Sequence, residues 1–396
     1  MTILKSKPIT YILPALLLIC TFLVSTFLTY QQVYTEVLYK LSGSVGRMGY
    51  NSDTLEHISF LKEFFNGEQF IPHPLWHIGV KIISFITPLS VENSAILFSS
   101  FLITFWVFLV YITTNSLLKK SYPNKEYLYI LVTIIIVTIA PLNLPFYDKF
   151  IFLGQGSPNI WHNVTLWTVK PFSLLTILFT LKALRLQNIK LYTYAILFAI
   201  LSLFAKPSFI IIFIPSLILL MITKKYFSKT QILFLATLIF ISFGILLYQM
   251  IFTFNAESSI IFDFLGVWSL NSKNIIISML LSLAFPLTFT LLHRQSLQNE
   301  YIVLAWLQTF FGIILFMCFA ESGPHYSHGN FSWSYMIALS LLYLFTIIEF
   351  IKIFPFLQLW KKIVLSFIFI IQSYTGLFYF YKILKGYHPL YIGFFL

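Results

Sequence analysis

The stretch NSAILFSSFLITFWVFLVYITTNSLL (residues 93–118) decides the fold of this chain. It contains no charged residue and ends directly before Lys119 and Lys120. A helix that crosses the ~30 Å hydrocarbon layer of a membrane needs about 20 mostly apolar residues. The stretch therefore predicts a membrane-spanning helix whose C-terminal end lies at the boundary between lipid and water.

Similar stretches recur along the 396 residues, of which 59% are hydrophobic and 10% charged. Two of them, 191–205 and 208–223, are short and flank Lys206-Pro207, so they could form one broken hairpin. We expect about 11 transmembrane helices, with a range of 10–12, in one all-α, polytopic domain that spans residues 1–396. The stretches are 10–30, 93–118, 127–145, 166–184, 191–205, 208–223, 231–253, 274–292, 301–320, 334–351 and 363–384.

The charges divide the connections between these stretches into two sets. One set of alternate connections carries 15 of the 25 Lys and Arg residues and three of the 13 acids, whereas the other set has equal numbers of both. The positive-inside rule makes the Lys-rich face cytoplasmic. This predicts a multi-pass protein of the cell (inner) membrane with its N-terminus in the cytoplasm and its C-terminus outside. Seven of the eight histidines and all three aspartates then lie on the extracytoplasmic face.

The remaining composition excludes other classes. The basic excess follows the membrane topology and forms no basic aromatic surface, so we expect no nucleic-acid partner. Cys20 and Cys318 lie in apolar stretches without a CxxC partner, so neither a disulfide framework nor a thiolate metal site is indicated.

The first extracytoplasmic loop, residues 31–92, carries the densest polar chemistry. Ser52 or Asp53 could cap a helix in which Glu56 completes a capping box. Asp53, Glu56 and His57 then share one polar edge, and Asp53 is either a catalytic carboxylate or an N-cap. The apolar residues that predict an amphipathic surface helix are Leu55, Ile58, Leu61, Phe64 and Phe65.

A second group in this loop contains His73 and His77. Because Pro74 follows His73, we expect a helix that begins near Pro74, with an apolar run over 78–88 that dips into the bilayer without crossing it. The two histidines could ligate zinc with a nearby carboxylate, or they could form hydrogen bonds at the interface. No HExxH motif is present, and we assign no metal ligand, although a divalent metal stays possible.

Later outer connections supply further polar and aromatic residues. Trp161-His162 would suit a sugar ring, although both residue types are also common at membrane interfaces. Lys170 and Lys206 each precede a proline just inside the outer end of a stretch, where a cation either serves a function such as phosphate binding or snorkels to the surface. The other candidates in these loops are Asp148, Glu321, His325 and His328.

This pattern resembles the GT-C superfamily of integral-membrane glycosyltransferases, which have about 8–13 spans and an early acidic residue in a long first outer loop. Asp53 to His57 match that placement, although Thr54 stands where the superfamily often has a second acid. The chain is also similar to O-antigen polymerases in length, span number and Phe/Ile-rich composition. The O-antigen polymerases, however, usually have their largest loops later in the chain.

The resemblance implies transfer of a sugar from a polyprenyl-phosphate-linked donor to a glycan or glycolipid acceptor, in polysaccharide biosynthesis at the cell envelope. Asp53 would be the general base, with His57 or Glu56 assisting it. Lys170 and Lys206, with Arg47, would neutralise the leaving phosphate. The residues expected to bind substrate are Arg47, His73, His77, Asp148, Trp161, His162, Lys170, Lys206, Glu321, His325 and His328.

Two classes compete with this hypothesis. A transporter or flippase places ionisable residues near the bilayer midplane, whereas the polar residues here gather in outer loops. A nonenzymatic assembly protein needs a partner surface and no convergent pocket. The sequence favours the enzyme.

Overall fold

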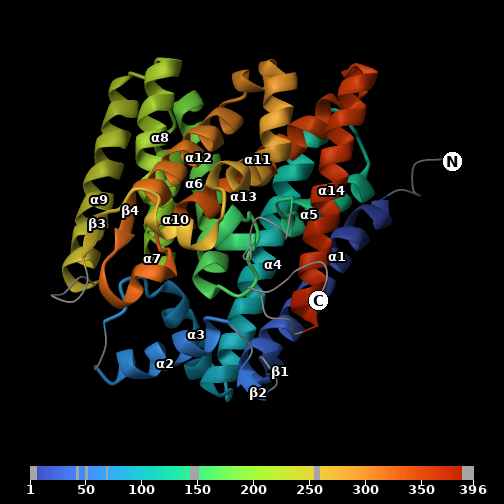
Figure 1. The fold of residues 1–396 in the computed structure, drawn as a ribbon. Coiled ribbons are helices and arrows are strands. Elements are labelled where there is room, and N and C mark those ends of the chain that lie inside the picture. Colours follow the sequence, from blue (N-terminus) through green and yellow to red (C-terminus); the bar gives the residue numbers. More distant parts are fainter. Residues whose placement is uncertain are drawn as a thin grey trace.

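Apolar helices make up most of the protein in the computed structural model, which describes residues 7–41, 44–49, 52–67, 70–142, 151–253 and 259–385 (Figure 1). Only the backbone is described for residues 7–11, 36–41, 44–49, 151, 152 and 325. The helices are α1 (Lys7–Tyr34), α2 (Thr54–Phe65), α3 (Leu75–Ile86), α4 (Val91–Leu118), α5 (Glu126–Thr138), α6 (Val164–Leu186), α7 (Ile189–Ala205), α8 (Ser208–Lys224), α9 (Lys229–Thr253), α10 (Gly266–Asn271), α11 (Ile275–Leu292), α12 (Glu300–Cys318), α13 (Ser332–Ile353) and α14 (Leu359–Leu384). The strands are β1 (Glu36–Leu41), β2 (Ser44–Gly49), β3 (Ile260–Phe262) and β4 (Phe319–Glu321).

Among the residues that the structure describes, eight helices are long and apolar enough to cross a membrane, as expected for a multi-pass membrane protein. They are α1, α4, α6, α9, α11, α12, α13 and α14. The other three predicted stretches form α5, α7 and α8, which are apolar but only 13 to 17 residues long. The helical prediction over 127–145 is too long, because α5 ends at Thr138 and Ile139 has an extended ψ of 142°.

Helix α13 lies at the centre of the bundle and packs against α4, α5, α6, α8, α11 and α12 (Figure 1). Nearly every side chain from Ser332 to Phe350 is buried. A helix that is apolar all round can be buried in this way, whereas α9 and α14 expose many large apolar side chains to their surroundings. The core therefore forms around α13, and the outer helices present a lipid-compatible surface.

The Lys-rich connections meet at one end of the bundle. Tyr122, between α4 and α5, donates to the carbonyl of Ile351 near the end of α13 at 2.9 Å. Arg185 at the end of α6 binds Glu300 at the start of α12 at 2.8 Å. Lys361 of α14 donates to the last carbonyl of α11 at 2.8 Å. These contacts confirm that the alternate connections share one face; their cytoplasmic orientation stays a prediction.

The first outer loop contains the two predicted helices and also an antiparallel hairpin, in which Glu36 pairs with Gly49 and Leu41 with Ser44. The sequence analysis predicts no strand in this loop. Helix α2 buries Ile58 and Leu61, as its apolar spacing predicts, and α2 and α3 lie at the lower end of the bundle in Figure 1.

Helix α3 is too short to cross a membrane and exposes much of its apolar face. Ile82 and Phe85 are largely exposed, and they line a small hollow with Phe64 and Phe65 of α2. Exposed apolar side chains on a short helix are typical of a segment that lies in the membrane interface. The length and the exposed surface of α3 are therefore consistent with the prediction that the apolar run over 78–88 enters the bilayer without crossing it.

Candidate functional site

Asp53 lies where the first outer loop meets the segment before α6. Its backbone N–H donates to the carbonyl of His162 at 3.1 Å, and the hydroxyl of Ser52 donates to the same carbonyl at 3.0 Å. The side-chain amide of Asn163 donates to the Asp53 carboxylate. Two segments that are 110 residues apart in sequence are thus joined at the half-buried carboxylate.

The predicted capping box is wrong. Asp53 occupies the N-cap position of α2, but its side chain makes no capping hydrogen bond, because the carboxylate is turned toward Asn163. Ser52 instead accepts from the Thr54 N–H at 3.2 Å. Glu56 is exposed on the surface of α2. The alternative in which Asp53 is only a helix cap does not hold.

Asn163 has one orientation because its two ends have different partners. Its side-chain oxygen caps α6 by accepting from the N–H of Leu166 at 2.8 Å and from the hydroxyl of Thr165 at 2.9 Å. The amide nitrogen must therefore be the end that faces Asp53. The residues at the start of α6 therefore fix the position of the Asp53 carboxylate and give it a hydrogen-bond donor as its partner.

Lys206 extends the same network. It lies at the break between α7 and α8, where it is buried and donates to the Thr165 hydroxyl at 2.8 Å. Its ammonium group lies 4.7 Å from the centre of the Trp333 ring, and it interacts electrostatically with Asp53 and with Glu321. Glu321, at the end of β4, accepts from Asn330 at 2.8 Å. One cation and two carboxylates from three separate connections therefore gather at this face.

The histidines of the first loop form a neighbouring group. His57 Nδ1 and His77 Nε2 are 3.1 Å apart. Burial lowers the pKa of His77 to about 4 and that of His73 to about 3, and the latter pKa is lowered further by Lys206 and His77. The pKa of His57 is well below its usual value because of burial, then of repulsion from His77, His73 and Lys206. All three rings are neutral at pH 7, and His57 contacts His77 rather than orienting Asp53.

Two predicted binding residues have packing roles. Trp161 is 5% exposed, with its ring centre 4.6 Å from that of Trp167 and 4.4 Å from that of Phe380, so its face is not open to a sugar. His162 is buried beside Asp53, where burial lowers the pKa of its ring and the Asp53 carboxylate raises it. The backbone carbonyl of His162 accepts from Asp53 and so joins the two segments.

Lys170 does not share a site with Lys206 in the way that the sequence predicts. It is fully buried in α6, where its ammonium group donates to the carbonyl of Pro158 at 2.9 Å and to the Asn159 side chain at 3.0 Å. Its charge lies 4.3 Å from the centre of the Trp167 ring. Lys170 therefore holds the segment before α6 in place.

The remaining predicted residues are His328, His325, Arg47 and Asp148, and the side chain is described for His328 alone. His328 is exposed on the turn Gly323–His328, where only the backbone of His325 is described. Arg47 lies on β2, and its side chain is outside the description, while Asp148 is outside the described residues altogether. Among the residues that the structure describes, no group of three or more His, Cys, Asp or Glu side chains is arranged to hold a metal ion.

Sequence reasoning missed the roles of Asn163, Thr165 and Trp333. Asn163 stands directly before an apolar stretch, which is a common N-cap signal, and this spacing could have placed it at the start of α6.

Comparison with known protein families and with curated proteins gives no match for this chain.

Proposed function

We propose that this protein transfers a sugar from a polyprenyl-phosphate-linked donor to an acceptor hydroxyl, at the face that carries Asp53 and Lys206. The observation that carries the proposal is the network from Asp53 through Asn163 and Thr165 to Lys206. It combines a half-buried carboxylate with a cation at the end of apolar helices, where the head group of a lipid-linked donor would lie.

In this reaction Asp53 accepts the proton of the acceptor hydroxyl while the acceptor oxygen forms a bond to the anomeric carbon. The bond between that carbon and the phosphate oxygen breaks, and its electron pair remains on the lipid phosphate. Lys206 stabilises this developing negative charge. Asn163 is a positioning residue, since it orients the carboxylate without reaching the reacting atoms. Glu321 is the second carboxylate near Lys206 and would contact the acceptor.

The test is transfer of radiolabelled sugar by the purified full chain from a panel of short-chain polyprenyl-phosphate hexoses. Asp53→Asn keeps the size of the side chain and an oxygen that can accept from Asn163. We expect normal accumulation in the membrane and a loss of about 100-fold or more in turnover, which is the usual worth of a positioned base. Glu63→Gln is the matched control and should keep full activity, since Glu63 lies on the same helix and its carboxylate accepts from Ser59 instead of joining the Asp53 network.

Near-native transfer by Asp53→Asn together with its loss in Glu321→Gln would place the base in the later loop. Absence of transfer by the unmodified chain with every donor of the panel, in membranes that contain native acceptors, would contradict glycosyl transfer itself. Transfer that requires a lipid-linked glycan as acceptor would identify the same chemistry as polymerisation.

A further inference from the structure

A cavity of about 950 Å³ opens at the Lys-rich end of the bundle, opposite the end that carries Asp53. Its volume is at the upper end of the range for small-molecule sites, about 300–1,000 Å³. The ends of α6, α11 and α13 and the starts of α12 and α14 contribute to its wall. Its ionisable residues are Arg185, His293, Glu300, Glu349, Lys352 and Lys361.

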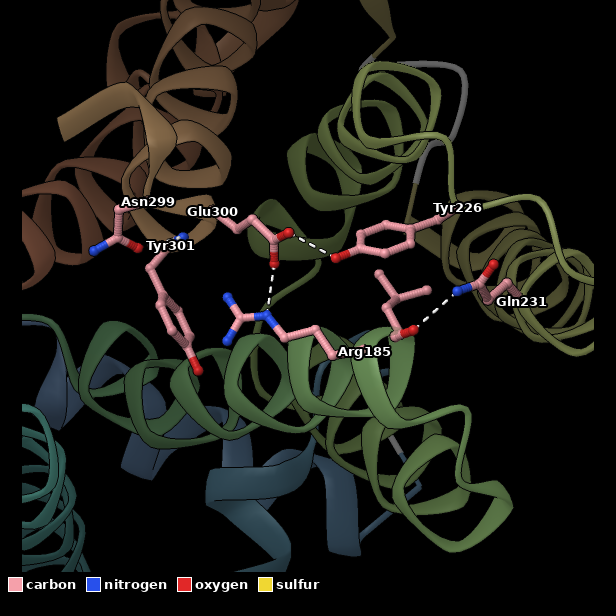
Figure 2. A network of polar contacts seen from close by, with 7 residues as sticks. Arg185, Tyr226, Gln231, Asn299, Glu300 and Tyr301 are labelled. Atoms are coloured by element: carbon pink, nitrogen blue, oxygen red, sulfur yellow. Dashed lines mark hydrogen bonds and ion pairs between the residues drawn. The ribbon is translucent and has the colours of Figure 1, made fainter. Parts of the chain in front are cut away.

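The two carboxylates of this wall already have partners. Glu300 accepts from Arg185 Nε at 2.8 Å with one oxygen and from the Tyr226 hydroxyl at 2.6 Å with the other (Figure 2). Both oxygens of Glu349 lie 3.2 Å from the Lys352 ammonium group, and one of them also accepts from Asn299. Neither carboxylate therefore needs a bound cation to balance its charge.

The cations keep capacity to bind an anion. Arg185 uses Nε for Glu300, and Figure 2 shows its two terminal nitrogens on the side that faces Tyr301. Lys361 donates to a backbone carbonyl at 2.8 Å, and no carboxylate among the described residues forms an ion pair with it. Burial lowers the pKa of His293, with Glu349 opposing that effect, so this ring adds no charge at pH 7. Three cations against two carboxylates make the wall positive.

The other half of the wall is apolar. Phe345, Ile348 and Phe356 line the cavity, and Phe356 is 86% exposed. Leu359 and Trp360 follow at the start of α14 and are also exposed. Exposed tryptophan at the end of a membrane helix is typical of the interface with the lipid head groups. The mouth of the cavity therefore lies beside a lipid-compatible surface.

We propose that this cavity binds the phosphate of an anionic membrane phospholipid, held by Arg185, Lys352 and Lys361, with the acyl chains against Phe356 and its exposed apolar neighbours. Guanidinium and ammonium groups are the usual partners of phosphate in proteins. Basic pockets between membrane helices on the cytoplasmic side bind anionic head groups. This proposal does not depend on glycosyl transfer, since it concerns the opposite end of the bundle.

The test uses the purified full chain in neutral detergent, titrated with dioleoylphosphatidylglycerol, with bound lipid counted by native mass spectrometry. Lys361→Gln should weaken binding about tenfold or more, because a contact with a charged group is lost. Lys362→Gln is the matched control, since Lys362 is the next residue on α14 and donates to the carbonyl of Pro355 instead of lining the cavity. Its affinity should stay unchanged.

Two further variants separate binding from folding. Lys361→Arg keeps the charge and should keep the affinity. Glu349→Gln removes the carboxylate that engages Lys352, so phosphatidylglycerol should bind more tightly, a gain that a merely structural defect would not produce. Thermal unfolding without added lipid checks each fold, and Glu349→Gln tests the proposal even if Lys361→Gln fails to fold.

Three results would overturn the proposal. Equal binding of dioleoylphosphatidylcholine would remove the requirement for an anionic lipid. Equal weakening in Lys361→Gln and Lys362→Gln would reduce the effect to general attraction by a basic surface. Displacement of the lipid by millimolar glycerol phosphate would assign the cavity to a soluble phosphate compound instead of a membrane lipid.

Discussion

Replacement of Lys206 by Met separates a role in donor binding from a role in folding. The lysine is buried, donates to Thr165 at 2.8 Å and lies 4.7 Å from the centre of the Trp333 ring. Methionine retains much of the apolar stem but has no charge and no hydrogen-bond donor. The variant therefore removes the group proposed to neutralise the phosphate while it keeps most of the packing.

The two effects differ in size. Loss of a charged contact with phosphate costs about 1.5–3 kcal/mol, which is a decrease of about 10- to 100-fold in donor affinity. Folding loses the bond to Thr165 and a cation–π contact worth about 0.5–2 kcal/mol, but it no longer bears the cost of burying a charge. Because Asp53 and Glu321 are only half-buried, water screens them when the cation is removed. We expect the free energy of unfolding to change by about 1 kcal/mol or less.

Farnesyl phosphate is a suitable soluble probe, and its affinity can be measured by microscale thermophoresis, with thermal unfolding recorded on the same samples. Lys206→Arg keeps the charge and should retain most of the affinity. Unchanged affinity in Lys206→Met together with a large fall in thermal stability would refute the reasoning, since the lysine would then act only in packing.

Two further predictions concern buried polar groups. Lys170→Met leaves the acceptors at Pro158 and Asn159 without their donor, at about 1–3 kcal/mol each, but it also removes the cost of burying a charge, so the free energy of unfolding should fall by less than the sum of the two losses. Farnesyl phosphate affinity should not change; thermal unfolding and the binding assay check both. The second concerns pH: the folded pKa values of His73 and His77, about 3 and about 4, lie below the unfolded value of about 6.5. The unfolded chain therefore binds protons that the folded chain does not, so stability is present above pH 6.5 and falls by about 1.4 kcal/mol per pH unit per histidine as pH drops toward 4. In denaturant titrations at several pH values, His77→Gln should reduce the dependence of the free energy of unfolding on pH. An unchanged dependence would show that the His77 ring is already solvated in the folded protein.

The sequence predicts the helices of this protein well because apolar length is a local property. Each of the eleven predicted stretches overlaps a helix, although 127–145 runs past the end of α5 and 301–320 runs past the end of α12 into β4, and the alternate Lys-rich connections meet at one end. The same signal does not decide whether α5, α7 and α8 cross a membrane, since each is shorter than the usual span. Helix α5 stops early because Pro141 follows closely after its end.

The site is less predictable because it depends on which loops meet. Asp53 and Lys206 were found as single residues, but Asn163 and Thr165 connect them through contacts over 41 to 110 positions. Lys170 and Lys206 look alike in sequence, since each precedes a proline. They differ in structure because the segment before α6 offers Lys170 two oxygen acceptors, whereas Lys206 donates to the Thr165 hydroxyl on α6 itself.

The charge balance at the outer face connects the histidines to the proposed reaction. Among the described side chains of this site, the two carboxylates Asp53 and Glu321 lie near one cation, Lys206. Burial and the Lys206 cation keep His57 and His73 neutral in the protein without substrate. A bound phosphate would offset the repulsion from Lys206 and raise the pKa of both rings, since a nearby opposite charge stabilises the charged form, while burial, the larger cause, would remain. Because the pKa of His73 is about 3 in the free protein, the rise of about 1–3 that an opposite charge produces would leave its ring mostly neutral at pH 7, so Lys206 remains the cation proposed for the phosphate.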